Sequence, residues 1–463
     1  MLALSEDTGE ERGQALERMT IFYLQAAETA DRLAYPGRVR LDGHPADPGL
    51  PLPRLRNADE TRAWFNTEHG NLLAAERYAR THGFPHLSAR IAHSLAGFLD
   101  AECRWQDAVD VLQHAAAHWS SSGDRPALCV ALLCLSSTHA STGRYPQAAE
   151  TGERALEIAR ATGDREAEAE ALRVLGVLHW HLGENRTAVE LHQKALAIRM
   201  TAGSIWDQAK CHNNIAISLL SLGEQDRALE YFRQAISGFR TAGDQSGLAR
   251  ALNNLGDLYA HKGDLTRARR AFEESLPLAE STGNLYAQAT VRTNLAAILA
   301  ESGDPGAALA LHQQALREFQ VLGDRKSQAT AHNGLGEAHH KAGSADEAER
   351  HHRKALDIAR GIGTTQEVTR ALRGLGRTEL GRGQLDSAAE HLEAAIAAAH
   401  RVNDPDEEAR ARDTLAEVRL ATGDVRGAKE LLRQALAMMC ILDEQEAIRI
   451  NNRLIEIDQT STG

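Results

Sequence analysis

The chain has 463 residues, of which 43% are hydrophobic, 25% charged and 4% aromatic. This composition, dominated by alanine and leucine, is typical of closely packed helices rather than of sheets. The formal net charge of −12 weighs against a general grip on nucleic acid, which needs a concentrated basic face, so proteins or peptides are the expected partners. No stretch approaches 18 uninterrupted apolar residues, so no membrane contact is expected.

The N-terminal region divides into a helix and a proline-rich segment. The first residues, MLALSEDTGEER, are acidic where a signal peptide would be basic, so a cytoplasmic location is expected. Apolar residues recur with helical spacing from Gln14 to Leu33, which predicts a helix within residues 1–35. Residues 36–58 are predicted to form a linker or an extended strap. They hold five of the chain's eleven prolines: Pro36, Pro45, Pro48, Pro51 and Pro53.

A capping helix is predicted next, over residues 59–82. Trp64, Phe65, Leu72 and Tyr78 recur there at helical spacing, as expected of a half-unit that enters a stack of repeats.

Two series of glycines then divide the chain into units of forty residues. The first series is Gly143, Gly183, Gly223, Gly263, Gly303, Gly343, Gly383 and Gly423. The second lies midway between them, with Asn403 in its last place: Gly83, Gly123, Gly163, Gly203, Gly243, Gly283, Gly323 and Gly363. A chain folding around one core has no reason to keep such a period, so residues 83–442 are predicted to form about nine copies of one unit.

Each unit is predicted to be two amphipathic helices. Glycine suits the residue after a helix because it adopts a left-handed conformation without steric cost. Aspartates that follow these glycines are placed to cap the next helix: Asp124, Asp164, Asp244, Asp264, Asp304, Asp324 and Asp424. Two columns of small residues, which begin at Ala148 and Ala155, predict close helix packing. Residues 443–463 are expected to form a departing capping helix and tail.

The stretch NNLGDLYAHKGDLTRARRAFEESL, Asn253 to Leu276, resembles the tetratricopeptide (TPR) repeat. Its period of 40 exceeds the usual 34 and is similar to that of the repeats of kinesin light chain. The resemblance implies an all-α fold, an α-solenoid with the right-handed superhelix of TPR proteins, whose concave side binds a protein or peptide.

A second resemblance lies before the repeats. RMTIFYLQAAETADRLAYPGRVRL at Arg18–Leu41 and ADETRAWFNTEHGNLLAAERYARTHG at Ala58–Gly83 resemble the junction before the TPR sensor of actinobacterial STAND regulators of the AfsR type. The resemblance implies a sensor that controls a nucleotide-binding module. The sequence contains no GxxxxGK[ST] phosphate loop, so an ATPase or regulator is an expected partner rather than an activity of this chain.

Asparagines recur in the first helix of successive units and are candidate ligand contacts. In long-period TPR arrays similar to this one, asparagines at these positions line the inner groove, where an amide offers a donor and an acceptor to a peptide main chain. The alternative is that they tie neighbouring helices together. The candidates, with two basic residues one turn earlier, are Asn213, Asn214, Asn253, Asn254, Asn294, Asn333, Lys210 and Arg250.

A basic stripe, Arg370, Arg373 and Arg377, is a candidate for gripping an acidic segment or a phosphate. Glu337 and Glu417 share the repeat position of Arg377, so a ladder of ion pairs between repeats is the alternative reading.

The sequence predicts no metal site, cofactor or enzymatic activity. Among the 21 histidines, His339, His340, His351 and His352 invite a metal hypothesis. Against it, His192, His312 and His352 share one repeat position, so their spacing follows the repeat template, and no cysteine or carboxylate pair converges with them at ligand spacing. No catalytic arrangement stands out. The cysteines show no CxxC pair and are expected to be reduced: Cys103, Cys129, Cys134, Cys211 and Cys440.

The functional hypothesis is a non-enzymatic, peptide-binding sensor or adaptor. Two alternatives stay open, a receptor that closes around a small effector and a passive scaffold for other enzymes. An open groove over several units would favour the peptide, one closed pocket the effector, and an exposed apolar patch on the convex face the scaffold.

Overall fold

A computed structural model describes residues 9–35, 38–41, 43, 49–102, 104–442 and 444–461. The predictions for Pro36, Pro45, Pro48 and Cys103 fall outside these residues. Within them the chain forms 21 helices and no strand, so the prediction of an all-α solenoid is confirmed. The chain divides into two units, Met1–Asp244 and Gln245–Gly463, each described by itself.

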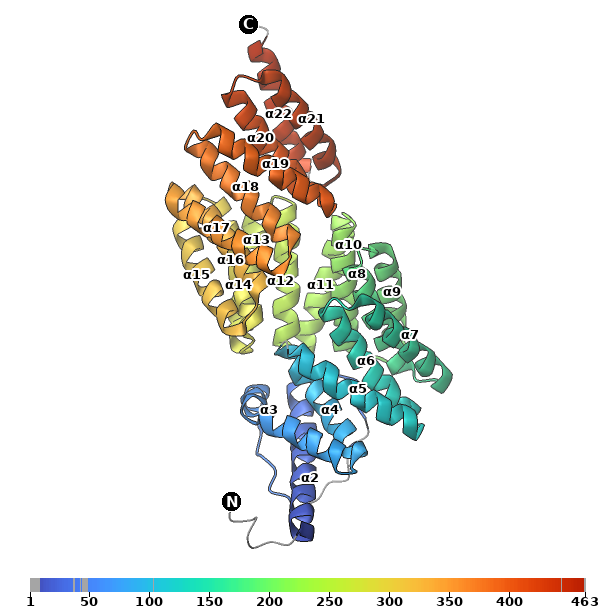
Figure 1. Ribbon diagram of the computed structural model, residues 1–463. Helices are drawn as coiled ribbons and strands as arrows, with labels where there is room; N and C mark the ends of the chain where they lie inside the picture. The colour runs from blue at the N-terminus through green and yellow to red at the C-terminus, as the bar shows by residue number, and fades with distance from the viewer. Residues whose placement is uncertain are drawn as a thin grey trace. The chain divides into compact units, whose positions relative to one another are not determined.

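Unit 1 holds ten helices in consecutive antiparallel pairs (Figure 1). They are α2 Gly9–Ala34, α3 Ala58–Thr81, α4 Pro85–Ala101, α5 Trp105–Ser122, α6 Arg125–Ser141, α7 Tyr145–Thr162, α8 Arg165–His181, α9 Asn185–Ala202, α10 Ile205–Ser221 and α11 Gln225–Ala242.

Unit 2 continues the same pattern with eleven helices. They are α12 Gln245–His261, α13 Leu265–Ser281, α14 Leu285–Glu301, α15 Pro305–Leu322, α16 Arg325–Lys341, α17 Ala345–Ile362, α18 Thr365–Gly381, α19 Leu385–Arg401, α20 Pro405–Ala421, α21 Val425–Leu442 and α22 Glu444–Ser461.

The turns follow the predicted chemistry with one exception. The repeat glycines have positive φ, for example 70° at Gly243, and Asn403 takes over the role with φ 54°. Gly203 differs, because its φ of −91° is extended backbone, and α10 begins after it with Ser204 as its cap. Asp264 and Asp304 accept the expected bonds from the backbone nitrogens of Arg267 and Ala307, each at 3.0 Å.

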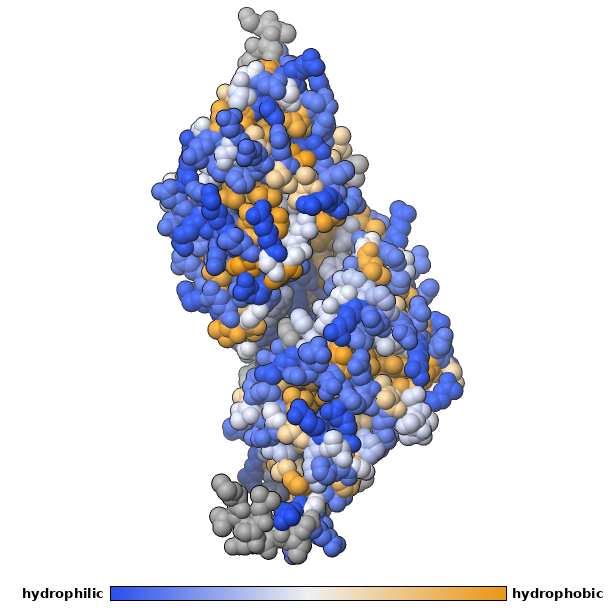
Figure 2. All heavy atoms as spheres, viewed as in Figure 1, coloured by the Kyte–Doolittle hydropathy of each residue, from blue (hydrophilic) through white to orange (hydrophobic). Residues whose placement is uncertain are grey.

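The core is built from the two small-residue columns. Every member of the columns beginning at Ala148 and Ala155 is fully buried (0% exposed), including Ser275, whose hydroxyl donates to the carbonyl of Ala249 at 2.8 Å. Close approach of the helices needs these small side chains, so the columns fix how each hairpin packs on the next. On the face shown in Figure 2, hydrophilic side chains predominate and apolar ones form separate patches.

The helices form an inner and an outer layer within each unit. Successive even-numbered helices contact one another, as α12 contacts α14 and α14 contacts α16. The odd-numbered helices make no comparable contacts among themselves in the residues described. The even-numbered helices therefore form the inner layer, and the residues between them are the candidates for ligand contact.

Candidate binding site on the inner helices

Four polar residues of α12 and α14 form what we call the asparagine–aspartate cluster: Asn253, Asn254, Asp257 and Asn294. The Nδ2 of Asn294 donates to Asn253 Oδ1 at 3.1 Å and to Asp257 Oδ1 at 3.2 Å. Asn253 is 9% exposed, whereas the other three are half-buried. The amide of Asn294 therefore bridges two inner helices, and the cluster keeps a partly open polar face.

Asp257 is a carboxylate for which the described residues supply no cationic partner. No arginine, lysine or histidine among them forms an ion pair with it, and it accepts a hydrogen bond from the neutral amide of Asn294. Burial raises its pKa to about 7. A desolvated carboxylate of this kind gains free energy when a positive group approaches, since ionisation is then compensated.

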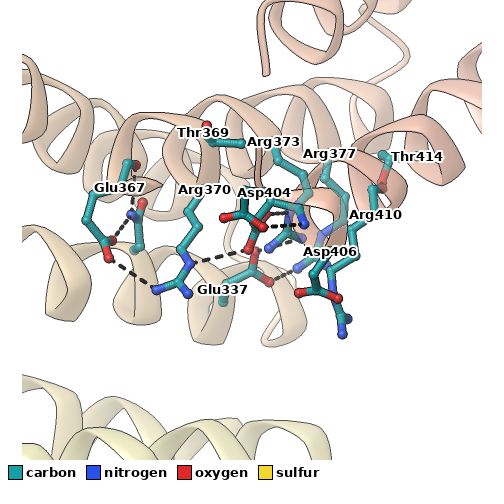
Figure 3. Close-up of polar contacts among 12 residues, drawn as sticks. Glu337, Glu367, Thr369, Arg370, Arg373, Arg377, Asp404, Asp406, Arg410 and Thr414 are labelled. Carbon is teal, nitrogen blue, oxygen red and sulfur yellow. Dashed lines mark hydrogen bonds and ion pairs between the residues drawn. The ribbon is translucent and has the colours of Figure 1, made fainter. Parts of the chain in front are cut away.

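The basic stripe lies within a network of ion pairs that we call the arginine ladder: Glu337, Glu367, Arg370, Arg373, Arg377 and Glu407 (Figure 3). Arg370 and Arg373 both reach Glu407, at 3.3 and 2.8 Å, and Arg377 pairs with Glu337. Each guanidinium of the stripe thus already has a carboxylate partner, and an acidic ligand would have to compete with it.

The ladder is shielded from solvent at Glu407, whereas the Arg370 side chain is 37% exposed. Glu407 is 5% exposed, and burial alone would raise the pKa of its carboxyl group. Arg373 and Arg370 outweigh that effect, so the pKa of Glu407 is lowered. Asn333 belongs to the same region, because its Nδ2 donates to Glu367 Oε2 at 2.9 Å and the residue is 6% exposed.

The remaining candidates lie on two helices of different units. On α10, Asn213 and Asn214 are half-buried, and the Lys210 ammonium lies 4.1 Å from the ring centroid of Trp206. On α12, Arg250 is exposed. These positions leave the side chains reachable from solvent within their own units.

Part of the inner layer of unit 1 is covered by the chain itself. The strap, Arg38–Leu41, lies against α4 and α6, where Arg38 Nη2 donates to the His93 carbonyl at 3.0 Å and to Cys134 Sγ at 3.6 Å. Asp31 of α2, 2% exposed, pairs with Arg38 and with Arg40. Gly97 leaves room for the strap, because a Cβ there would lie 2.9 Å from Arg38 Cδ.

A depression in unit 2 bears on the small-effector alternative. It lies among α19, α20 and α21, is open to solvent, and is lined in part by Ile396, Leu415 and Leu431. Two of its charged side chains are already engaged, since Glu393 pairs with Arg419 and Asp424 caps α21. It does not have the enclosed form expected of a pocket that closes around a metabolite.

Sequence reasoning missed Asp257 and the contacts that the strap makes with α4 and α6. Asp257 shares its repeat position with Glu337, Arg377 and Glu417. A charged residue recurs at this position, so the sequence alone could have identified Asp257 as a candidate. The strap carried no periodic signal, because its contacts with α4 and α6 join residues far apart in the chain.

Two tetratricopeptide repeat profiles match the sequence. One matches residues 87–161, 127–201, 247–320, 286–361, 327–400 and 367–440, and the other matches residues 209–242. Together these segments cover well over half of the chain, which therefore belongs to the tetratricopeptide repeat family. None of the described helices is both long and apolar enough to cross a bilayer.

Similar solved structures share this fold at low sequence identity. The apo form of the quorum sensor NprR from B. thuringiensis has a TM-score of 0.56 at 15% identity, over 74% of this chain and 99% of that one. A Rap protein complexed with competence and sporulation factor has a TM-score of 0.50 at 16% identity, over 72% and 98%. No curated protein matches the sequence.

A third structure contains a sensor of the kind implied by the N-terminal resemblance. It is a STAND protein with a tetratricopeptide repeat sensor from Pyrococcus horikoshii, with a TM-score of 0.51 at 14% identity over 75% of this chain. The match covers 55% of that protein, so this chain spans about half its length. Identities this low establish the fold and leave function to be argued from the site.

Proposed function

We propose that the chain is a non-enzymatic sensor or adaptor that binds an extended peptide with a positively charged side chain on its inner helices. The observation that carries the proposal is the asparagine–aspartate cluster. Asn254 supplies an amide and Asn294 an amide oxygen that can bond to a peptide main chain, and the uncompensated carboxylate of Asp257 supplies a partner for arginine or lysine.

The strap supports this ligand chemistry. Within unit 1, an arginine from an extended segment lies on the inner layer and donates to a backbone carbonyl of α4. Its charge is compensated by Asp31 of α2. The inner helices of this array therefore accommodate a guanidinium when a buried carboxylate is close by, and the cluster in unit 2 presents such a carboxylate.

The other candidate residues take different parts in the proposal. Asn213, Asn214 and Lys210 are proposed contacts in unit 1, and Arg250 is one in unit 2. Asn333 and the stripe Arg370, Arg373 and Arg377 are proposed to hold the inner helices in register, since carboxylates already engage them.

The biological setting we propose is regulatory. The junction at Arg18–Gly83 resembles that of AfsR-type STAND regulators, and the similar structures include a Rap protein in complex with a Phr* peptide. In this setting the chain would report peptide binding to an ATPase or another regulatory partner, in the cytoplasm.

A capture experiment tests the peptide site. The full chain is immobilised and incubated with a pool of random hexapeptides, and bound peptides are quantified by mass spectrometry. We expect Asn254→Ala/Asn294→Ala to reduce capture at least tenfold with helicity unchanged, because both main-chain contacts are lost.

The matched control replaces two exposed asparagines of α22, Asn451→Ala/Asn452→Ala, and should capture as much as the natural sequence. Equal capture by all three proteins, or capture by none, would refute the peptide site.

A further inference from the structure

Three metal-ligand side chains, His339, Glu347 and His351, converge between α16 and α17, and His332 contacts one of them. His332 and His339 are seven residues apart on α16, and Glu347 and His351 are four apart on α17, so each pair lies on one face of its helix. The two helices pack as one hairpin. One ligand atom each of His339, Glu347 and His351 lies within 4.8 Å of the others, and His332 Nδ1 lies 3.0 Å from His351 Nδ1.

His332 is placed to orient His351. Its Nδ1 lies 3.0 Å from His351 Nδ1, a hydrogen-bond distance, which leaves His351 Nε2 to face Arg350 at 3.2 Å. A histidine that binds a metal through one nitrogen usually makes a hydrogen bond through the other, which fixes its ring. The rings of His339 and His351 stack with centroids 5.4 Å apart.

The repeat template does not require histidine at these positions. Leucine stands at the position of His332 in Leu172, Leu252 and Leu372, and at that of His351 in Leu191, Leu311 and Leu431. Histidine also occurs at these positions, in His212 and His391, but only the hairpin of α16 and α17 combines the two.

His192 and His352, which share one repeat position, have a packing role instead. His192 and His352 fill the space left by glycines, since a Cβ added at Gly176 or Gly336 would lie 2.5 Å from their rings. The prediction of no metal site was drawn from this template column and from the lack of a convergent cysteine or carboxylate pair.

Glu347 pairs with Arg350, an exposed i, i+3 contact that a divalent ion can displace.

We propose that His339, Glu347 and His351 bind a Zn²⁺ ion that joins α16 to α17, and that His332 orients the ring of His351. Two imidazoles and one carboxylate leave the fourth tetrahedral position to water. The proposal does not depend on peptide binding, because none of the four residues belongs to the asparagine–aspartate cluster.

Metal titration of the full chain tests the site. After removal of metal with a chelator, Zn²⁺ is titrated by calorimetry and Co²⁺ by visible absorption. We expect one equivalent of Zn²⁺ per chain, the spectrum of tetrahedral Co²⁺, and a melting temperature that rises with Zn²⁺. His332→Leu and His351→Leu should each weaken Zn²⁺ binding at least tenfold, and leucine at the same position in other repeats makes both variants compatible with the fold.

Glu347→Gln changes an exposed residue, so it tests the site without altering the core, and it should also weaken binding at least tenfold. His261→Leu removes an exposed histidine at the end of α12 and should bind as the natural sequence does. No stoichiometric Zn²⁺ uptake, or undiminished binding by the His332, His351 and Glu347 variants, would overturn the proposal.

Discussion

One repeat position has opposite electrostatic surroundings in two regions of unit 2. In α12 it holds Asp257, whose carboxylate accepts a bond from the amide of Asn294 and has no cationic partner among the described residues. In α16 and α18 it holds Glu337 and Arg377, which pair with each other across the two helices. Both regions lie on inner helices of the same array, so the difference comes from the side chains rather than from the backbone.

The comparison separates charges that hold the array together from a charge that is available to a ligand. In the arginine ladder, carboxylates and guanidinium groups satisfy one another, and a ligand gains little by displacing them. In the asparagine–aspartate cluster, the carboxylate is desolvated without compensation, and a cationic ligand removes that cost.

The largest effect on stability is expected in the ladder. Glu407→Gln leaves the guanidinium groups of Arg370 and Arg373 without their shared buried carboxylate, and we expect the free energy of unfolding to fall by about 3 kcal/mol. Urea unfolding followed by helicity measures the change.

The control is Glu393→Gln, whose partner Arg419 is more than a third exposed, and it should cost less than about 0.5 kcal/mol. Similar losses in the two variants would show that the ladder has no special structural role.

Replacement of Asp257 is expected to raise the free energy of unfolding, by less than the Glu407 substitution lowers it. Its folded pKa of about 7 lies above the unfolded value of about 3.9, so the folded chain holds a proton that the unfolded chain has released. Stability therefore falls as the pH rises from about 4 to about 7. Asp257→Asn should be more stable than the natural sequence at pH 8 by about 2 kcal/mol, about half of the full effect because the residue is half-buried, and equal to it below about pH 4.

Urea unfolding at both pH values checks the Asp257 prediction. If the substitution were destabilising at pH 8, Asp257 would have a compensating partner, and the contrast with the ladder would not hold.

Most of the fold could be predicted because its determinants are local and repeated. Glycine at a helix end and aspartate as a cap act within a few residues, so the pattern alone placed the helices. Gly203 is the exception, since its extended φ shows that a repeat position does not fix the conformation of its residue. The burial of the alanine columns could also be predicted, because each position in a column needs a small side chain for the helices to pack closely.

The sites were harder to predict because they depend on departures from the repeat. Asp257 is distinguished by the absence of an ion-pair partner among the described residues, and His332 and His351 by their contact across one hairpin. The strap reaches α4 and α6 through Arg38, whose partners lie 55 and 96 residues away. The repeat pattern shows only what the units have in common. Contacts that occur in a single unit, such as these, could not be predicted from it.

The charge of the captured peptides tests the central claim most directly. The natural sequence and Asp257→Asn are each incubated with the same random hexapeptide pool, and the bound peptides are sequenced by mass spectrometry. We expect peptides bound by the natural sequence to be enriched in arginine and lysine, and the enrichment to disappear with Asp257→Asn. Capture of the same basic peptides by both proteins would contradict the account.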